Sequence, residues 1–421
     1  MRPWMLIKKK LESAFKTGFF HLFGTLLLVQ VLAFGLKISL GHWLNTEDFA
    51  RASLLIETNN LLATLMALGL PTAMIRYGLS ENRLDDYLSG TLRLFSLLAL
   101  VVSIGFLGIN ALVPLFTDPL TQTWVVYSLW AAPGLALFSY LINWLSAKKQ
   151  AKERALVVLG QRALYALCLG IGAFLGALKG AVLGLLCQGL ILPFLLLGRY
   201  RKAALGPHVP IKKRALLRFS GIDSLSHLAG FIAPFWILWA SERGLAHLEE
   251  VSWLAMAFSF SVVAKFFFAS LYNVAFPYLM EKREKRAFSR FLWLLIGLGL
   301  VMGLLVMGFG FTLLPWLIGW LLPAKFLASV PLLGWLLLAE CLIGLSLIYE
   351  MALESLAAVR IKAGALLSGL LVMSLVLYPA MENAGALGLA QAFLIFAVVR
   401  LTLAGLGTHG LLALKQEDNL R

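Results

Sequence analysis

Residues 291–313 read FLWLLIGLGLVMGLLVMGFGFTL, a stretch without a charged side chain. About 20 apolar residues in a helix are enough to cross the hydrocarbon core of a bilayer. Similar runs recur along the chain, which has 421 residues, 60% of them hydrophobic and 14% charged. The mean hydropathy is +0.86, far above the usual value for a soluble domain. The sequence therefore predicts an all-α membrane protein.

Proline, glycine and charged residues divide the apolar runs into twelve predicted membrane spans. Of the 36 Lys and Arg residues, 28 fall on one side of this layout and only four in the loops of the other side. The positive-inside rule places the basic side, and with it both termini, in the cytoplasm. The rule also accounts for the net charge of +15 without nucleic acid. The expected spans are 17–40, 52–75, 88–113, 122–146, 155–176, 181–198, 215–240, 251–279, 288–313, 328–357, 363–380 and 386–408.

The predicted spans form two sets of six that resemble each other faintly. The second and the eighth span each end with a proline, Pro71 and Pro277, about one turn before a charged loop. Many transporters are built from such internal repeats around a central site. We expect two pseudo-symmetric six-helix bundles around a central cavity, over residues 1–198 and 215–421, joined by a basic cytoplasmic linker at 199–214.

Signatures of catalysis and of metal binding are absent from the sequence. The cysteines Cys168, Cys187 and Cys341 lie in apolar segments and have no metal-ligand spacing. No P-loop, HExxH or Gly-x-Ser-x-Gly motif occurs. We expect no enzyme, no cofactor and no metal, so transport would draw on an ion gradient, the membrane potential or removal of the substrate.

Residues 68–77, at the end of the second span, read LGLPTAMIRY. This motif resembles the same place in Wzx-type polysaccharide flippases, a branch of the multidrug/oligosaccharidyl-lipid/polysaccharide exporter (MOP) superfamily, and the layout is similar over the whole chain. The resemblance implies a substrate that is an oligosaccharide linked to polyprenyl pyrophosphate, such as an O-antigen, capsule or exopolysaccharide repeat unit. It also implies the bacterial cytoplasmic (inner) membrane and, as a further partner, the polysaccharide polymerase machinery.

Cations inside the spans are the first candidates for substrate binding. A charge at bilayer depth costs roughly 2.5–3.5 kcal/mol, so it must face a partner or a wet cavity. Lys265 lies deepest, and we expect it to line a cationic cavity for pyrophosphate together with Arg76 and Lys37. The alternative for Lys265 is an ion pair with Glu57 or Glu340. Lys37 could instead reach the outer interface with its long stem, and positive-inside anchoring explains Arg76 about as well.

Further polar residues extend the predicted site. Glu57 and Asn60 are expected to hydrogen-bond sugar hydroxyls, with contacts between helices as the alternative. Arg400 is a further candidate for substrate binding, although anchoring near the cytoplasmic surface explains it as well. Asp223 and His227 lie one helical turn apart and are candidates for coupling or gating.

The tenth span is unusual because it carries three carboxylates. At 100° per residue, Glu340, Glu350 and Glu354 share a stripe about 80° wide, so they face inward together or not at all. We expect Glu340 to pair with a cation from the other half or to carry a coupling ion, H⁺ or Na⁺. Glu354 is expected to pair with Arg360.

Three other functions fit parts of the sequence. An ion-coupled drug or metabolite antiporter of the same superfamily would be favoured by an acidic cavity. A membrane glycosyltransferase or polymerase would be favoured by sugar transfer, although the sequence lacks the large outer loops that such enzymes use. A major-facilitator carrier also has two sets of six spans, but residues 77–87 match its Gly- and Arg-rich loop poorly.

Overall fold

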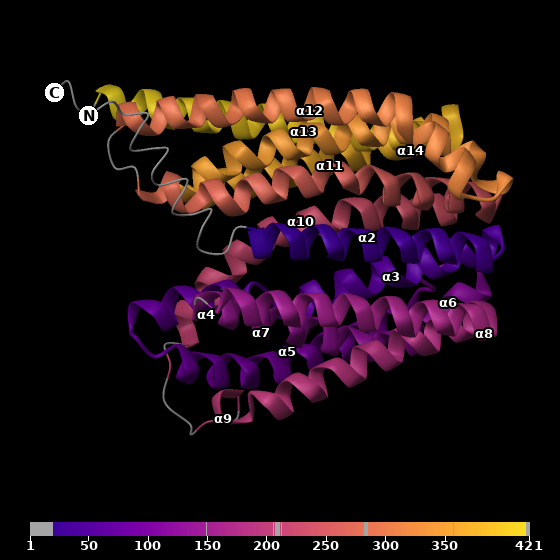
Figure 1. The fold of residues 1–421 in the computed structure, drawn as a ribbon, viewed down its shortest axis with the longest axis horizontal. Helices are drawn as coiled ribbons and strands as arrows, with labels where there is room; N and C mark the ends of the chain where they lie inside the picture. The colour runs from indigo at the N-terminus through magenta and orange to yellow at the C-terminus, as the bar shows by residue number, and fades with distance from the viewer. Residues whose placement is uncertain are drawn as a thin grey trace.

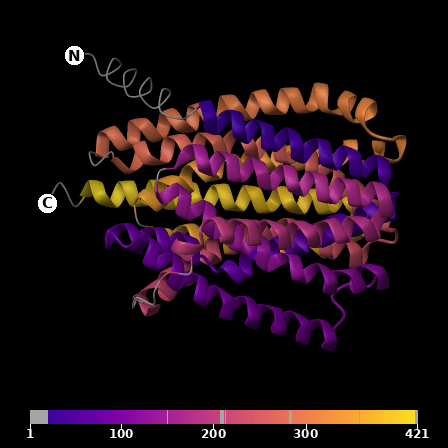
Figure 2. The same cartoon turned by 60° about the horizontal axis from the view of Figure 1, so that its bottom comes forward.

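The computed structural model describes residues 20–148, 150–204, 206, 211, 213–281, 285–356 and 358–417. Within these ranges the chain is almost entirely helical and contains no strand. Long helices run side by side in both views (Figures 1 and 2). Seven helical stretches of the described chain are long and apolar enough to cross a membrane. The predicted all-α membrane fold is confirmed.

The helices up to residue 204 are here called the N-half. Loops at 81–83, 148–150 and 200 lie at one end of this bundle, and the loops at 44–45 and 113–118 lie at the other. The elements are α2 (Phe20–Trp43), α3 (Thr46–Ala67), α4 (Leu70–Ser80), α5 (Leu84–Leu112), α6 (Pro119–Ser128), the 3-10 turn η2 (Leu129–Ala131), α7 (Ala132–Ala147), α8 (Ala151–Arg199) and the short α9 (Arg201–Ala204).

The helices from residue 213 onward are here called the C-half. Its third helix passes through Pro315 and ends at Leu321, well beyond the predicted limit of 313, which leaves a shorter loop than expected. The elements are α10 (Lys213–Gly244), α11 (Leu248–Glu281), α12 (Lys285–Leu321), the 3-10 turn η3 (Ala324–Ser329), α13 (Val330–Ser355) and α14 (Val359–Glu417).

Helix α8 reverses direction in its middle and therefore contains two predicted spans. Gly176 (φ −142°, ψ 23°) and Ala177 (φ 47°, ψ −131°) leave the helical conformation. The two arms then pack backbone against backbone, because a Cβ on Gly172 would lie only 2.1 Å from the carbonyl oxygen of Gly180. Glycine at these positions allows the close approach of the arms.

Helix α14 contains the same reversal. Ala384 (φ −143°, ψ 16°) and Gly385 (φ 56°, ψ −135°) follow nearly the same backbone path as residues 176–177. A Cβ on Gly388 would lie 1.8 Å from the carbonyl oxygen of Ala380, so these arms also touch. With both reversals, the described helices make about twelve crossings, and each half ends in the same hairpin.

The second predicted span, 52–75, is not one continuous helix. Helix α3 ends at Leu68, which adopts a left-handed conformation (φ 42°), and Gly69 follows with φ 62°. Pro71 stands in the first turn of α4, where its missing N–H costs nothing. The segment LGLPT therefore bends the span, and α4 takes a separate direction towards α10, which it contacts.

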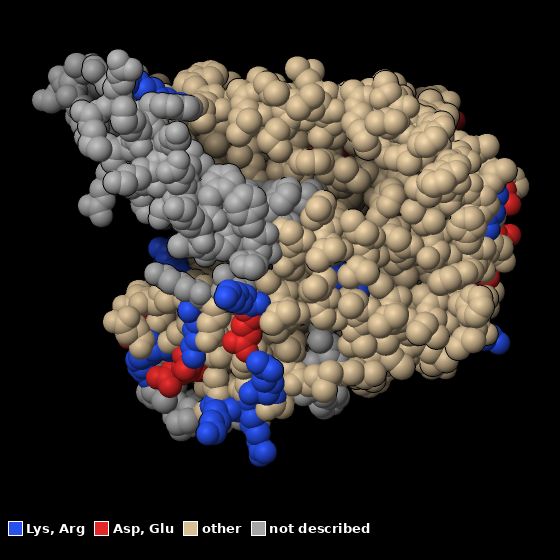
Figure 3. Space-filling view, in the orientation of Figure 1, with Lys and Arg blue, Asp and Glu red and all other residues tan. Residues whose placement is uncertain are grey.

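Charge distinguishes the two ends of the molecule. Figure 3 shows Lys and Arg gathered at the end that carries α9 and the loop between α4 and α5, here called the basic end. The opposite end, here called the far end, carries the loops at 44–45, 113–118, 245–247 and 322–329 and the two hairpin turns. Most of the surface between the ends is uncharged in this view, as a lipid-facing surface requires.

The hairpin turns give a test of the fold. Ala177 has the backbone conformation that Gly385 has, and a non-glycine residue there is strained by about 1–3 kcal/mol. Ala177→Gly should therefore raise the thermal unfolding temperature of the purified protein. Gly385→Ala should lower it, because its Cβ would also approach Glu250 Oε2 to 3.1 Å. If neither substitution changed the unfolding temperature, the claim that Ala177 and Gly385 occupy equivalent strained turns would be contradicted.

Candidate functional site: intramembrane charges and the closed far end

A polar cluster at membrane depth joins three helices of the N-half. Glu57 on α3 interacts electrostatically with Lys37 on α2, whose Nζ also lies 5.6 Å from the ring centre of Phe49. Asn60 Nδ2 lies 3.4 Å from Glu57 Oε2 and donates a weak hydrogen bond to it. The structure thus brings together Lys37, Glu57 and Asn60, three residues that the sequence proposed independently.

Helix α8 adds two residues to this cluster. Tyr165 lies within electrostatic range of both Glu57 and Arg162. Sequence reasoning overlooked Tyr165, because a tyrosine in an apolar run carries no charge to mark it, and it favoured a surface anchor for Arg162. Lys37, Glu57 and Tyr165 are half-buried, and Arg162 is exposed.

Burial along α3 changes abruptly at this cluster. Every residue from Phe49 to Ile56 is buried, whereas an accessible stripe begins at Glu57 and continues through Asn60 and Thr64 towards the basic end. These positions follow the spacing of one helix face. Helix α11, which contacts α3 across the two halves, behaves alike: it is almost wholly buried from 251 to 258 and accessible at 259, 262 and 263. The interface is therefore closed at the far end and becomes accessible at mid-helix.

Two intramembrane cations described in the C-half, Arg400 and Lys362, form buried ion pairs. Arg400 on α14 donates to both carboxylate oxygens of Glu350 on α13, at 2.7 and 3.1 Å, and the side chains are 7% and 2% exposed. Ser346 Oγ donates to Glu350 as well. Glu340 on the same helix is also buried, at 3% exposure. In this state Arg400, a predicted substrate ligand, neutralises the carboxylate of Glu350 on the neighbouring helix α13.

The expected pairing of Glu354 with Arg360 is wrong. Glu354 instead forms an ion pair with Lys362 and accepts a hydrogen bond from the Tyr272 hydroxyl. Two residues along a helix turn the side chain by about 200°, so Arg360 and Lys362 point to opposite faces. Lys362 is on the buried face and Arg360 on the exposed one.

Arg76 lies at the basic end, where the two halves meet. Its guanidinium carbon stacks 4.5 Å from the ring centre of Phe219 on α10, and the neighbouring Tyr77 hydroxyl lies 3.4 Å from the carbonyl oxygen of Ala215. Arg76 is exposed, and no carboxylate of the described residues forms an ion pair with it. Its charge is therefore available to an anion approaching between α4 and α10.

Three predicted residues lie outside what the structure describes. Lys265 belongs to α11, and Asp223 and His227 belong to α10, but their side chains are not among the described ones. Their proposed roles remain predictions from the sequence.

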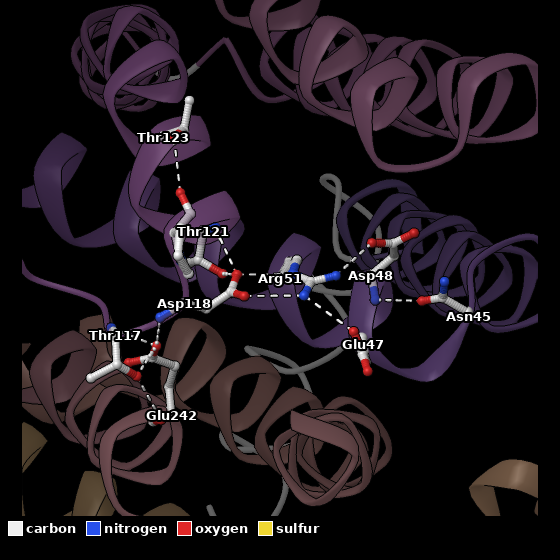
Figure 4. Close-up of polar contacts among 10 residues, drawn as sticks. Asn45, Glu47, Asp48, Arg51, Thr117, Asp118, Thr121, Thr123 and Glu242 are labelled. Carbon is white, nitrogen blue, oxygen red and sulfur yellow. Dashed lines mark hydrogen bonds and ion pairs between the residues drawn. The ribbon is translucent and has the colours of Figure 1, made fainter. Parts of the chain in front are cut away.

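Arg51 organises the far end of the N-half (Figure 4). This side chain is only 8% exposed and forms ion pairs with three carboxylates: Asp118 at 2.9 Å, Asp48 at 3.0 Å and Glu47 at 3.1 Å. Asp118 also caps α6 by accepting hydrogen bonds from the backbone N–H and the hydroxyl of Thr121. The sequence analysis counted Arg51 as an ordinary loop cation, although Glu47 and Asp48 at i−4 and i−3 were a usable signal.

Asp118 keeps its charge despite partial burial. Burial would raise its pKa, but hydrogen bonds from Arg51 and from Thr121 together outweigh this and hold the pKa below its usual value. Since the pKa is lowered in the folded protein, the stabilising contribution of Asp118 is complete above pH 3.8 and is lost only as the pH falls through the lower folded-state value.

Several hydrogen bonds join the two halves across the far end. Trp239 and Arg243 on α10 donate to the carbonyl oxygen of Leu115, in the loop at 113–118. Thr46 donates to Glu249 on α11, and Lys325 donates to the carbonyl oxygen of Leu44. These contacts close the far end around the start of α3.

Solved structures of other proteins share this arrangement of helices. No family model and no curated protein sequence matches the chain. Among solved structures, an inward-facing multidrug-resistance MATE family transporter of the MOP superfamily superimposes with a TM-score of 0.74 at 15% identity, over 92% of this chain and 95% of that one. The lipid II flippase MurJ in an inward closed conformation gives a TM-score of 0.74 at 15% identity, over 91% of this chain and 86% of that one. The chain shares its fold with these two transporters.

The likeness extends to a solved structure in another conformation. An outward-facing MATE family transporter superimposes with a TM-score of 0.68 at 14% identity, over 95% of both chains, below the 0.74 of the inward-facing one. At these identities the likeness shows the fold alone, and the Wzx branch stays a hypothesis.

The Glu350–Arg400 pair yields a stability prediction. Removing one member of a buried ion pair leaves an uncompensated charge and costs about 3–5 kcal/mol, whereas replacing both by apolar residues costs much less. Glu350→Leu and Arg400→Leu should each lower the thermal unfolding temperature in detergent sharply. The double variant should recover most of the loss. If the double variant lowered the unfolding temperature by the sum of the two single decreases, the two residues would act independently.

Proposed function

We propose that this protein is a flippase that moves a polyprenyl-pyrophosphate-linked oligosaccharide from the leaflet at the basic end to the leaflet at the far end by alternating access. The observation that carries the proposal is an imbalance between the halves. Accessible cations at or near membrane depth lie in the N-half, and the described intramembrane cations of the C-half are locked in buried ion pairs.

The N-half offers positive charge at two levels. Arg76 is exposed where α4 meets α10 at the basic end, Lys37 lies deeper within electrostatic range of Glu57, and Arg162 lies on α8 one turn from Tyr165. In this proposal Lys37 and Arg162 are both charged, so positive charge in this part of the N-half exceeds the single negative charge of Glu57. A doubly anionic pyrophosphate would be attracted first to Arg76 and then to this cluster. Such charge-assisted contacts strengthen where water is scarce.

The accessible stripe supplies groups for the sugar. Asn60 and Thr64 follow Glu57 on the same face of α3, and an amide, a hydroxyl and a carboxylate are the groups that bind sugar hydroxyls. In this proposal the hydrophilic glycan and pyrophosphate enter the accessible interior. The polyprenyl chain stays among the lipids, because a polar, hydrated interior would expose its apolar surface to water at a large cost in free energy.

Energy coupling belongs to the C-half in this proposal. Glu340 is buried in α13 and is the candidate for carrying H⁺ or Na⁺, together with Asp223 and His227 on α10. Arg400 would bind substrate only after releasing Glu350, which makes it a gating partner as well as a ligand. The protein would act in the bacterial inner membrane, beside the polysaccharide polymerase machinery.

A second candidate function is an ion-coupled drug or metabolite antiporter. The fold does not choose between the two, because the inward-facing MATE transporter and the lipid II flippase MurJ superimpose equally well. The buried carboxylates Glu340 and Glu350 favour the antiporter, since cationic drugs would need an acidic site. Lys37 and Arg162 in the N-half favour an anionic substrate, as does Arg76, which has no ion pair with a described carboxylate.

A translocation assay tests the proposed function. Purified protein in liposomes should move a fluorescent polyprenyl-pyrophosphate-linked oligosaccharide between leaflets, measured by its accessibility to a membrane-impermeant quencher. Arg76→Ala should slow this about tenfold or more, because it removes a charge-assisted contact with pyrophosphate. Arg76→Lys should retain part of the rate.

Arg201→Ala is the matched control, since Arg201 is also exposed at the basic end but lies on α9. It should leave the rate within about twofold, as expected for a solvated surface charge. Transport of cationic drugs with no movement of the lipid-linked glycan would replace this proposal by the antiporter. Equal losses from Arg76→Ala and Arg201→Ala would remove Arg76 from the substrate path.

A further inference from the structure

A buried carboxylate makes several short hydrogen bonds between the two halves and forms no ion pair with a described cation. Glu242, near the end of α10, is 5% exposed. Its Oε1 accepts three hydrogen bonds of 2.7 Å, from the backbone N–H groups of Thr117 and Asp118 and from the Thr117 hydroxyl. Its partners are all in the N-half, whereas Glu242 itself belongs to the C-half (Figure 4).

The site that receives Glu242 is suited to a carboxylate. Thr117 and Asp118 immediately precede α6, whose first residue is Pro119, so their N–H groups belong to the free donors at the helix N-terminus. The helix dipole adds partial positive charge there. Arg51 holds Asp118, and with it the loop, in position from the side of α3. The receiving site is therefore preformed by the N-half alone.

The contact is also incomplete. Glu242 Oε2 is buried and has no hydrogen-bond partner among the described residues. Strong hydrogen bonds to Oε1 stabilise the bound carboxylate. Burying Oε2 without a partner destabilises it, because an unsatisfied buried polar atom costs free energy. Such a contact can be released without dismantling either half, because water would satisfy both oxygens once the halves part.

We propose that Glu242 is the interlock of the far end: its carboxylate, seated on the N-terminus of α6, holds the two halves together there, and opening requires its withdrawal. Glu242 is a positioning residue that touches no substrate. The neighbouring bonds from Trp239 and Arg243 to Leu115 align the same loop. The Thr46–Glu249 hydrogen bond lies on the exposed rim and contributes less.

Thiol labelling tests the interlock without any substrate. Ser53 on α3 is buried at 3% exposure, two residues beyond Arg51. With Cys168, Cys187 and Cys341 replaced, Ser53→Cys in the full-length protein in liposomes should react slowly with a membrane-impermeant maleimide added on the far side. Adding Glu242→Ala should speed this reaction about tenfold or more, since charge-assisted buried hydrogen bonds are lost. Glu242→Gln, which keeps an acceptor oxygen but loses the charge, should give an intermediate rate.

Two controls keep the result interpretable. Glu249→Gln, on the exposed rim, should change the rate less than about twofold. Circular dichroism and gel filtration of each variant must match the parent, so that faster labelling reports opening and not unfolding. A labelling rate for Glu242→Ala equal to that of the parent, in a folded protein, would overturn the interlock. Because this readout needs no transported molecule, its failure is separate from failure of the proposed substrate.

Discussion

The cost of placing ionised side chains in a bilayer governs this structure. Each charge at membrane depth must be paired or reach water. The C-half takes the first course, with Glu350 bound to Arg400 and Glu354 to Lys362. The N-half takes the second, because Lys37, Glu57 and Arg162 are incompletely buried. This division makes the C-half a rigid support and leaves the N-half with charge to offer a ligand.

The same principle explains how the two ends differ. At the far end Arg51 binds three carboxylates within the N-half, and α10 and α11 donate or accept hydrogen bonds to the loops of the N-half. Towards the basic end α3 exposes one polar face and Arg76 remains free of an ion pair with any described carboxylate. A closed end opposite an accessible one is the arrangement that alternating access requires.

Much of the fold follows from the sequence because membrane spans are read from local composition. The twelve apolar segments and their alternating loop charge predicted the layout that the helices show. The break at Leu68 and Gly69 was missed, because Pro71 signals a helix start only if the preceding residues can turn left-handed. Ion pairs were harder to predict from the sequence than membrane spans. Glu354 pairs with Lys362 and not with Arg360, and Arg51 pairs with the distant Asp118, because both contacts depend on which helix faces meet, which no local pattern encodes. The pairs of Arg51 with Glu47 and Asp48 are local and were open to prediction.

Accessibility of the α3 stripe tests the central claim most directly. Asn60→Cys and Thr64→Cys, in a protein without its native cysteines, would be treated with a membrane-impermeant thiol reagent from one side of oriented vesicles at a time. The account predicts rapid labelling from the basic end and almost none from the far end. Labelling from neither side, which would mean a dry helix contact around Glu57, would contradict it.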